Sequence, residues 1–266
     1  MIKCIISNIR SSLWRWLLII VLFAGISCKS YNYIEFNNNS VPIFYEIILD
    51  QMNDIIMVCF ILSFAWYIII GDINRSWNQN LKKTTSIYSE TFHLFVYILL
   101  INLILLCILI LVNLVLYFIN AGSNFLFINE WIKDNELKNR GLNPFSSCII
   151  SIILNYLRFV FLSLLIYTVN QKSKNQFGVI IAIFINIIDW IFYRFFQIYE
   201  QLYILPIEHT SILFSNINIP KTNSFFQISY IISVLYWVIL IIITLIILYF
   251  QTKYKKDKRI KENDNN

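Results

Sequence analysis

A long run without a single charged residue, from Leu94 to Asn120, constrains the fold of this chain more than any other feature. A helix needs about 20 apolar residues to cross the hydrocarbon core of a bilayer, and this run is long enough even when tilted. The whole chain has the same character, since 58% of its residues are hydrophobic and 14% are charged. Soluble domains average roughly 45–50% apolar and about 25% charged residues. The sequence therefore predicts a polytopic membrane protein.

We expect an all-α fold with six transmembrane helices in one domain that covers residues 1–266. The helices are predicted over about residues 11–27, 52–70, 94–119, 147–169, 176–199 and 227–250. All four prolines lie outside these segments, at Pro42, Pro144, Pro206 and Pro220. The broken helices that form the binding sites of many secondary transporters are therefore not expected.

Basic residues are distributed unevenly about these spans. If both termini are cytoplasmic, the cytoplasmic segments hold 14 Lys and Arg residues and the outer segments hold 5. The positive-inside rule favours this orientation. Residues 251–266 then form a basic cytoplasmic tail, which we expect to be disordered. Because the basic residues lie in short segments between apolar runs, the net charge of +6 indicates membrane orientation and disfavours nucleic-acid binding.

The N-terminus combines a weak helical pattern with an imitation of a signal peptide. Four isoleucines at helical spacing fit either a short amphipathic helix in the headgroup region or a frayed tail, and they are Ile2, Ile5, Ile6 and Ile9. The apolar run before Cys28 resembles a lipoprotein signal, but Gly25, Ile26 and Ser27 fit the cleavage pattern poorly. A retained first helix is the favoured interpretation.

Two charged residues, Arg158 and Asp189, interrupt otherwise apolar spans and are candidates for function because such residues are costly in a membrane. Arg158 precedes Lys172 by 14 residues, and Asp189 follows Lys174 by 15. At about 1.5 Å per residue, both lie roughly 21–22 Å from those lysines, on adjacent antiparallel helices. We predict that they form an intramembrane polar pair. The pair either fixes the register of the two helices or lines a translocation path.

Other polar residues of the spans fall on shared helix faces. Ser147, Ser151, Asn155 and Arg158 form one stripe, and Asn186, Asp189, Tyr193 and Gln197 form another. Asn102 and Asn113 are eleven residues apart and share a face of the third span. These residues serve helix packing or a polar path, and packing is the commoner role of such contacts.

The longest polar interruption on the predicted cytoplasmic side runs from Gly71 to His93. Within it, four apolar residues share one side of a helical wheel: Ile73, Trp77, Leu81 and Tyr88. This pattern is typical of an amphipathic helix that lies on the membrane or docks into a soluble protein. One helix could do both.

Enzyme chemistry has little support in the sequence. The two histidines, His93 and His209, belong to no HExxH motif, and neither a GxSxG motif nor a nucleotide-binding P-loop is present. The five cysteines include no CxxC pair, which disfavours a metal site and a disulfide framework. We expect no catalytic residue, no metal and no cofactor bound by this chain.

The arrangement as a whole resembles the bacterial ABC-2 type permeases, the membrane subunits of ABC transporters. The resemblance is carried by the amphipathic start at Ile2–Ile9, the six spans, the basic loop RSWNQNLKKTTSIYSETF and the semi-apolar outer segment ILPIEHTSILF. It implies a multi-pass protein of the bacterial cell membrane that pairs with a second permease and with cytoplasmic ATPase subunits, which use the ATP. It also implies that the coupling helix falls on Arg75, Trp77, Leu81, Lys82 and Lys83.

The main alternative is a membrane protein that does not transport, such as an immunity or scaffold protein. It would function without an ATPase. An intramembrane enzyme is disfavoured by the missing catalytic groups. Membrane lipids are partners on every interpretation.

Overall fold

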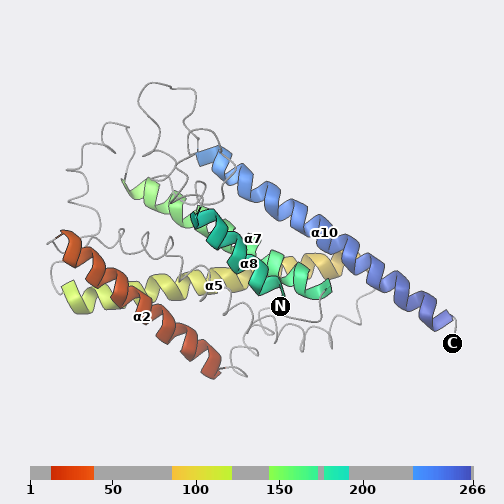
Figure 1. Cartoon of the computed structure of the whole chain (residues 1–266), viewed down its shortest axis with the longest axis horizontal. Coiled ribbons are helices and arrows are strands. Elements are labelled where there is room, and N and C mark those ends of the chain that lie inside the picture. The colour runs from red at the N-terminus through yellow and green to blue at the C-terminus, as the bar shows by residue number, and fades with distance from the viewer. Residues whose placement is uncertain (1–12, 39–85, 122–143, 173–176, 192–229, 265–266) are drawn as a thin grey trace.

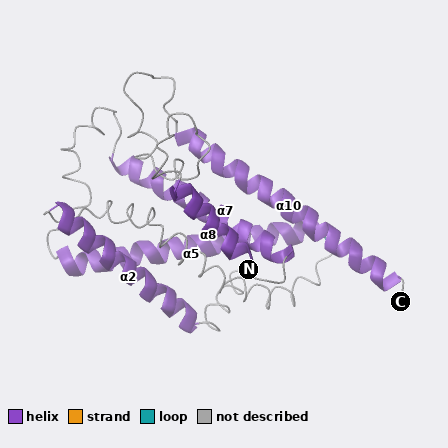
Figure 2. Ribbon diagram, viewed as in Figure 1, coloured by secondary structure: helices purple, strands orange, loops and turns teal. Residues whose placement is uncertain are grey.

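In the computed structural model, the secondary structure of the described residues is entirely α-helical (Figures 1 and 2). The structure describes residues 13–38, 86–121, 144–172, 177–191 and 230–264. The helices are α2 (Leu13–Asn38), α5 (Ile87–Ala121), α7 (Pro144–Lys172), α8 (Phe177–Ile191) and α10 (Tyr230–Asp264). The all-helical part of the predicted fold class is thus confirmed for these ranges.

Three helices of the described part are long and apolar enough to cross a membrane. They contribute Ile87–Ile119 from α5, Ile152–Gln171 from α7 and Ile231–Asp257 from α10, while α8 adds the shorter apolar segment Phe177–Ile188. A membrane-embedded protein is therefore supported by length and composition. The count of six spans and the cytoplasmic termini remain predictions, and the predicted span at 52–70 lies outside the described residues.

Several helices, α2 and α5 among them, extend beyond the apolar segments that predicted them. Helix α2 continues to Asn38, past the predicted end at residue 27, and α5 begins at Ile87 rather than near Leu94. The carbonyl of Ser86 accepts a 3.1 Å hydrogen bond from the amide of Glu90, which places Ser86 at the N-cap. Once a helix is nucleated, each further residue adds one hydrogen bond, so polar neighbours of a span readily join it.

The expectation of a disordered C-terminal tail was wrong, because α10 continues as one helix from Tyr230 to Asp264. The segment after Phe250 contains no glycine or proline, and Lys, Arg and Glu are good helix formers. Asp257 and Lys261 are four residues apart, the spacing at which opposite charges support a helix. The membrane span supplies the nucleus, and the charged segment only has to propagate it.

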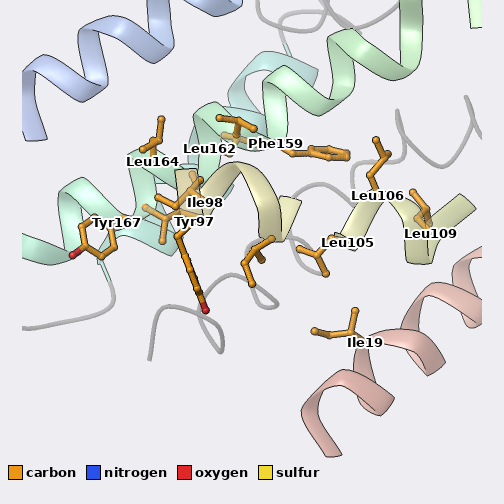
Figure 3. Packing of buried hydrophobic residues seen from close by; sticks show 14 of the residues in the cluster. Ile19, Tyr97, Ile98, Leu105, Leu106, Leu109, Phe159, Leu162, Leu164 and Tyr167 are labelled. Atoms are coloured by element: carbon orange, nitrogen blue, oxygen red, sulfur yellow. The ribbon is translucent and has the colours of Figure 1, made fainter. Parts of the chain in front are cut away.

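Helix α7 lies at the centre of the packing and contacts α5, α8 and α10, whereas α2 packs on α5. Figure 3 shows the buried side chains at these contacts, with Ile19 of α2 facing Leu105 of α5 and Phe159 of α7 near Leu106 of α5. On α2 the buried residues recur at helical spacing, at Trp16, Ile19, Phe23 and Ile26. Close packing of this kind is the main source of helix association inside a bilayer, where lipid chains are as apolar as the side chains.

The contacts also give the relative directions of the helices. Phe161 and Trp237 pack with ring centroids 5.9 Å apart, and further along both helices Lys255 bonds the carbonyl of Gln171, so α7 and α10 run the same way. Helix α8 returns antiparallel to α7 (Figure 1). The C-terminal ends of α7 and of the α10 span therefore lie at one end of the bundle.

Gly178, near the start of α8, lies against the C-terminal part of α7. Its amide donates a 2.8 Å hydrogen bond to Oδ1 of Asn170, which satisfies one of the free amides at the start of α8. A Cβ at this position would overlap the carbonyl oxygen of Ile166 and lie 2.9 Å from Oδ1 of Asn170. Only glycine allows the two helices to approach this closely.

Candidate functional site

Polar side chains are buried on two sides of α7, and together they form the candidate site. We call this set the polar seam: Asn102 on α5, Arg158 and Ser163 on α7, and Asn186 on α8. Arg158 and Asn186 form the contact on the α8 side, and Asn102 and Ser163 form the contact on the α5 side.

Arg158 is the charged member of the seam. It is only 4% exposed, and its Nη2 donates a 2.6 Å hydrogen bond to Oδ1 of Asn186. Asn186 donates its own Nδ2 to the carbonyl of Ala182 at 2.7 Å, which fixes the amide with its oxygen toward the guanidinium. A hydrogen bond from a charged donor is stronger than a neutral one, so this contact ties α8 to α7 among buried apolar side chains.

The contact on the α5 side is neutral. Nδ2 of Asn102 donates to Oγ of Ser163 at 3.1 Å and to the carbonyl of Ile98 at 3.0 Å. Oγ of Ser163 lies 2.6 Å from the carbonyl of Phe159 and 3.3 Å from Oδ1 of Asn102. A hydroxyl has one proton, and the shorter distance assigns it to Phe159. Oγ of Ser163 thus accepts a hydrogen bond from Nδ2 of Asn102, and this bond joins α5 to α7.

A tyrosine reinforces the same interface. The hydroxyl of Tyr156 on α7 donates to the carbonyl of Leu99 on α5 at 3.0 Å. A polar group placed among apolar side chains is costly unless it is hydrogen-bonded, and this bond satisfies the hydroxyl of the half-buried Tyr156. The α5–α7 interface is therefore held at two levels.

Of the other predicted polar residues, Asn155 is fully buried on α7, and Asn113 is buried on α5 with Nδ2 donating to the carbonyl of Leu109 at 2.9 Å. Asp189 lies in α8 three residues after Asn186, but its side chain is outside the described part, as is that of Ser151. The pairing of Arg158 with Asp189 therefore stays a prediction. Tyr193 and the predicted coupling residues Arg75, Trp77, Leu81, Lys82 and Lys83 also lie outside the described residues.

Sequence reasoning did not single out Ser163. Nor did it single out the other buried hydroxyls of the spans: Thr168, Ser233 and Thr244. Thr168 and Thr244 donate to carbonyls four residues earlier in their own helices, at 2.7 and 2.8 Å. Because a serine or threonine can satisfy itself in this way on any face, its presence in an apolar run does not reveal which ones bridge two helices.

A second polar group lies where α7 ends. Nζ of Lys255 donates to the carbonyl of Gln171, and Nε2 of Gln171 donates to the hydroxyl of Tyr167 at 2.8 Å. The last carbonyls of a helix lack intrahelical partners and carry partial negative charge, so a lysine there is favourable. This contact joins the start of the charged segment of α10 to the end of α7.

Among the residues that the structure describes, no group of three or more His, Cys, Asp and Glu side chains is placed to hold a metal ion. Comparison of the chain with protein-family models, curated proteins and solved structures gives no match.

Proposed function

We propose that this chain is the membrane-spanning permease subunit of an ATP-driven ABC transporter of the bacterial cell membrane, acting as an exporter. The observation that supports a transport role is Arg158, a buried cation on a helix long and apolar enough to span a membrane. Placing an arginine at the centre of a membrane helix costs about 2.5–3.5 kcal/mol on insertion scales. Such residues generally face the bundle interior and mark substrate or ion pathways.

The polar seam supports the same proposal because it gives α7 polar contacts toward two different neighbours. Asn186 lies on one side of α7 and Asn102 on the other. Conformational transitions repack helix interfaces between discrete arrangements, and hydrogen bonds between membrane helices are modest at about 0.6 kcal/mol on average, so such contacts can be exchanged. On this proposal the seam lines the path that opens alternately to the two sides.

The proposed ATPase and second permease are inferred from the sequence pattern. The chain carries no P-loop of its own, so the ATP would be used by a partner subunit. The predicted coupling residues, Arg75 to Lys83, precede Ser86, where α5 is capped. Because α5 reaches the polar seam through Asn102, a displacement at this loop would be carried to the seam by one helix.

The test is a mild-detergent pull-down of the tagged chain from its own cells, with mass spectrometry of the partners. We expect stoichiometric recovery of a protein that contains GxxxxGK[ST], and its loss in the Trp77→Asp/Leu81→Asp variant. The matched control, Asn78→Asp/Gln79→Asp, adds the same charge off the apolar face and is expected to retain the ATPase.

If no ATPase is recovered under conditions that preserve the membrane complex, the permease proposal fails and the immunity or scaffold alternative replaces it. If both double variants lose the ATPase equally, the apolar face of the loop is not the coupling surface.

A further inference from the structure

Helix α10 exposes one apolar stripe along its length and buries the opposite side. The exposed apolar residues of α10 include Leu235, Ile239, Ile242 and Ile246, which we call the outer stripe, and each of these four is between 49% and 53% exposed. Trp237, Ile241 and Leu248 are buried on the side that packs against the bundle. The outer stripe therefore faces the surroundings of the bundle, which are acyl chains if α10 spans the membrane.

The outer stripe ends at basic residues. Lys253 follows Leu235 by five complete helical turns, so it lies on the same face, and Lys256 lies one turn further on. Lys253 is exposed and Lys256 is half-buried. At about 1.5 Å per residue, they lie roughly 4.5 and 9 Å beyond Phe250, the last residue of the span predicted at 227–250. The headgroup layer of a bilayer is about 5–8 Å thick, and lysine side chains can reach back into it.

The fold fixes the position of Lys253 and Lys256 along the axis of α10. Lys255, between them, bonds the carbonyl of Gln171 at the end of α7, and the segment continues the helix of the span. Tyr249 and Tyr254 lie on α10 close to these lysines, and Tyr254 is exposed. Tyrosine is enriched at membrane–water interfaces because its ring is amphipathic. The basic residues are thus held on a rigid element at the edge of the apolar layer.

We propose that the outward face of α10 binds an anionic phospholipid, with an acyl chain along the outer stripe and the phosphate between Lys253 and Lys256. An apolar stripe that ends in cations matches both parts of such a lipid. An acidic soluble protein would match only the cations. The inference is independent of the proposed transport role.

The test is native mass spectrometry of the full-length protein in mild detergent, titrated with dioleoylphosphatidylglycerol or dioleoylphosphatidylcholine. The two lipids have the same chains, so the ratio of their apparent Kd values reports the headgroup alone. A basic residue near an anionic charge contributes about 1 kcal/mol, which is roughly fivefold in affinity. We expect the phosphatidylglycerol preference to fall roughly 25-fold in Lys253→Gln/Lys256→Gln.

The matched control is Lys258→Gln/Lys261→Gln, which removes the same charge about 12–17 Å beyond Phe250, outside the headgroup layer. We expect it to keep the preference. Glycerophosphoglycerol, the headgroup without chains, should not compete with the lipid if the outer stripe contributes.

Three results would overturn the proposal. They are equal binding of the two lipids by the unchanged protein, equal loss of preference in both double variants, and full competition by glycerophosphoglycerol. The last would identify a site for a free phosphate ester rather than a lipid. Circular dichroism of each variant verifies that the helices are retained.

Discussion

Breaking the hydrogen bond between Arg158 and Asn186 measures what the polar seam contributes to the fold. We choose Arg158→Met, which removes the charge at similar volume, and Asn186→Leu, which removes the acceptor. Asn186 also bonds the carbonyl of Ala182, so its single substitution costs more than the contact alone. A double-mutant cycle cancels that extra cost and isolates the pairwise interaction.

The expected magnitude follows from the geometry. Hydrogen bonds to charged groups contribute about 1.5–3 kcal/mol in soluble proteins, and bonds between membrane helices average about 0.6 and reach about 1.7 kcal/mol. The 2.6 Å bond joins two side chains that are 4% and 5% exposed. We therefore expect a coupling energy near the upper membrane value, about 1.5 kcal/mol.

The assay is reversible unfolding of the four proteins in mixed micelles of dodecylmaltoside and SDS, followed by circular dichroism. A control cycle combines Arg158→Met with Asn102→Leu, which lies on the other side of α7, and we expect it to be additive. A coupling energy below about 0.3–0.5 kcal/mol between Arg158 and Asn186 would refute the reasoning, because independent sites add to within that margin.

A second double-mutant cycle in the same assay tests whether Arg158 and Asp189 form the predicted ion pair. Combining Arg158→Met with Asp189→Asn should also show coupling, with the second substitution partly rescuing the first. Strictly additive effects would mean that Asp189 does not pair with Arg158. Asn186 precedes Asp189 by three residues, so both can lie on the side of α8 that meets α7.

Two further substitutions, each with a matched control, test the helix contacts. Gly178→Ala should destabilise the protein by about 1–3 kcal/mol in the same unfolding assay, since the added methyl overlaps the carbonyl of Ile166. The control is Gly25→Ala, where nothing lies within 4 Å of the added Cβ. We expect it to be neutral or stabilising by up to about 1 kcal/mol. Equal effects at the two glycines would contradict the close approach of α7 and α8. Lys255→Gln should speed amide hydrogen exchange over residues 251–264, because it releases α10 from Gln171. The control, Lys253→Gln in lipid-free detergent, should leave the exchange unchanged. Identical exchange in both variants would show that the contact between Lys255 and Gln171 does not hold the segment.

The helical segments were predictable because hydropathy and length constrain membrane helices directly. The run from Leu94 predicted α5, and the apolar segments near residues 147, 176 and 227 predicted parts of α7, α8 and α10. Helix ends were predicted less well, since a helix already nucleated in an apolar segment continues into polar sequence, as α2 does to Asn38 and α10 to Asp264.

The sequence predicts the arginine and the two asparagines of the candidate site, but it does not predict the serine that bonds to one of them. Arg158, Asn186 and Asn102 stand out because amides and cations in an apolar span need a partner. Ser163 does not stand out, because a hydroxyl can bond its own helix and only the packing of α7 on α5 turns it toward Asn102.

Because α10 is one continuous helix, a change in its tilt displaces its C-terminal end. Its last fourteen residues extend about 21 Å beyond Phe250 without a break, and the same helix packs on α7 through Trp237. A rigid rod transmits rotation without loss, so a 10° change in the tilt of α10 moves Asp264 by about 4 Å relative to Phe250. A small rearrangement around α7 is thus amplified into a displacement of several ångströms at the end of α10.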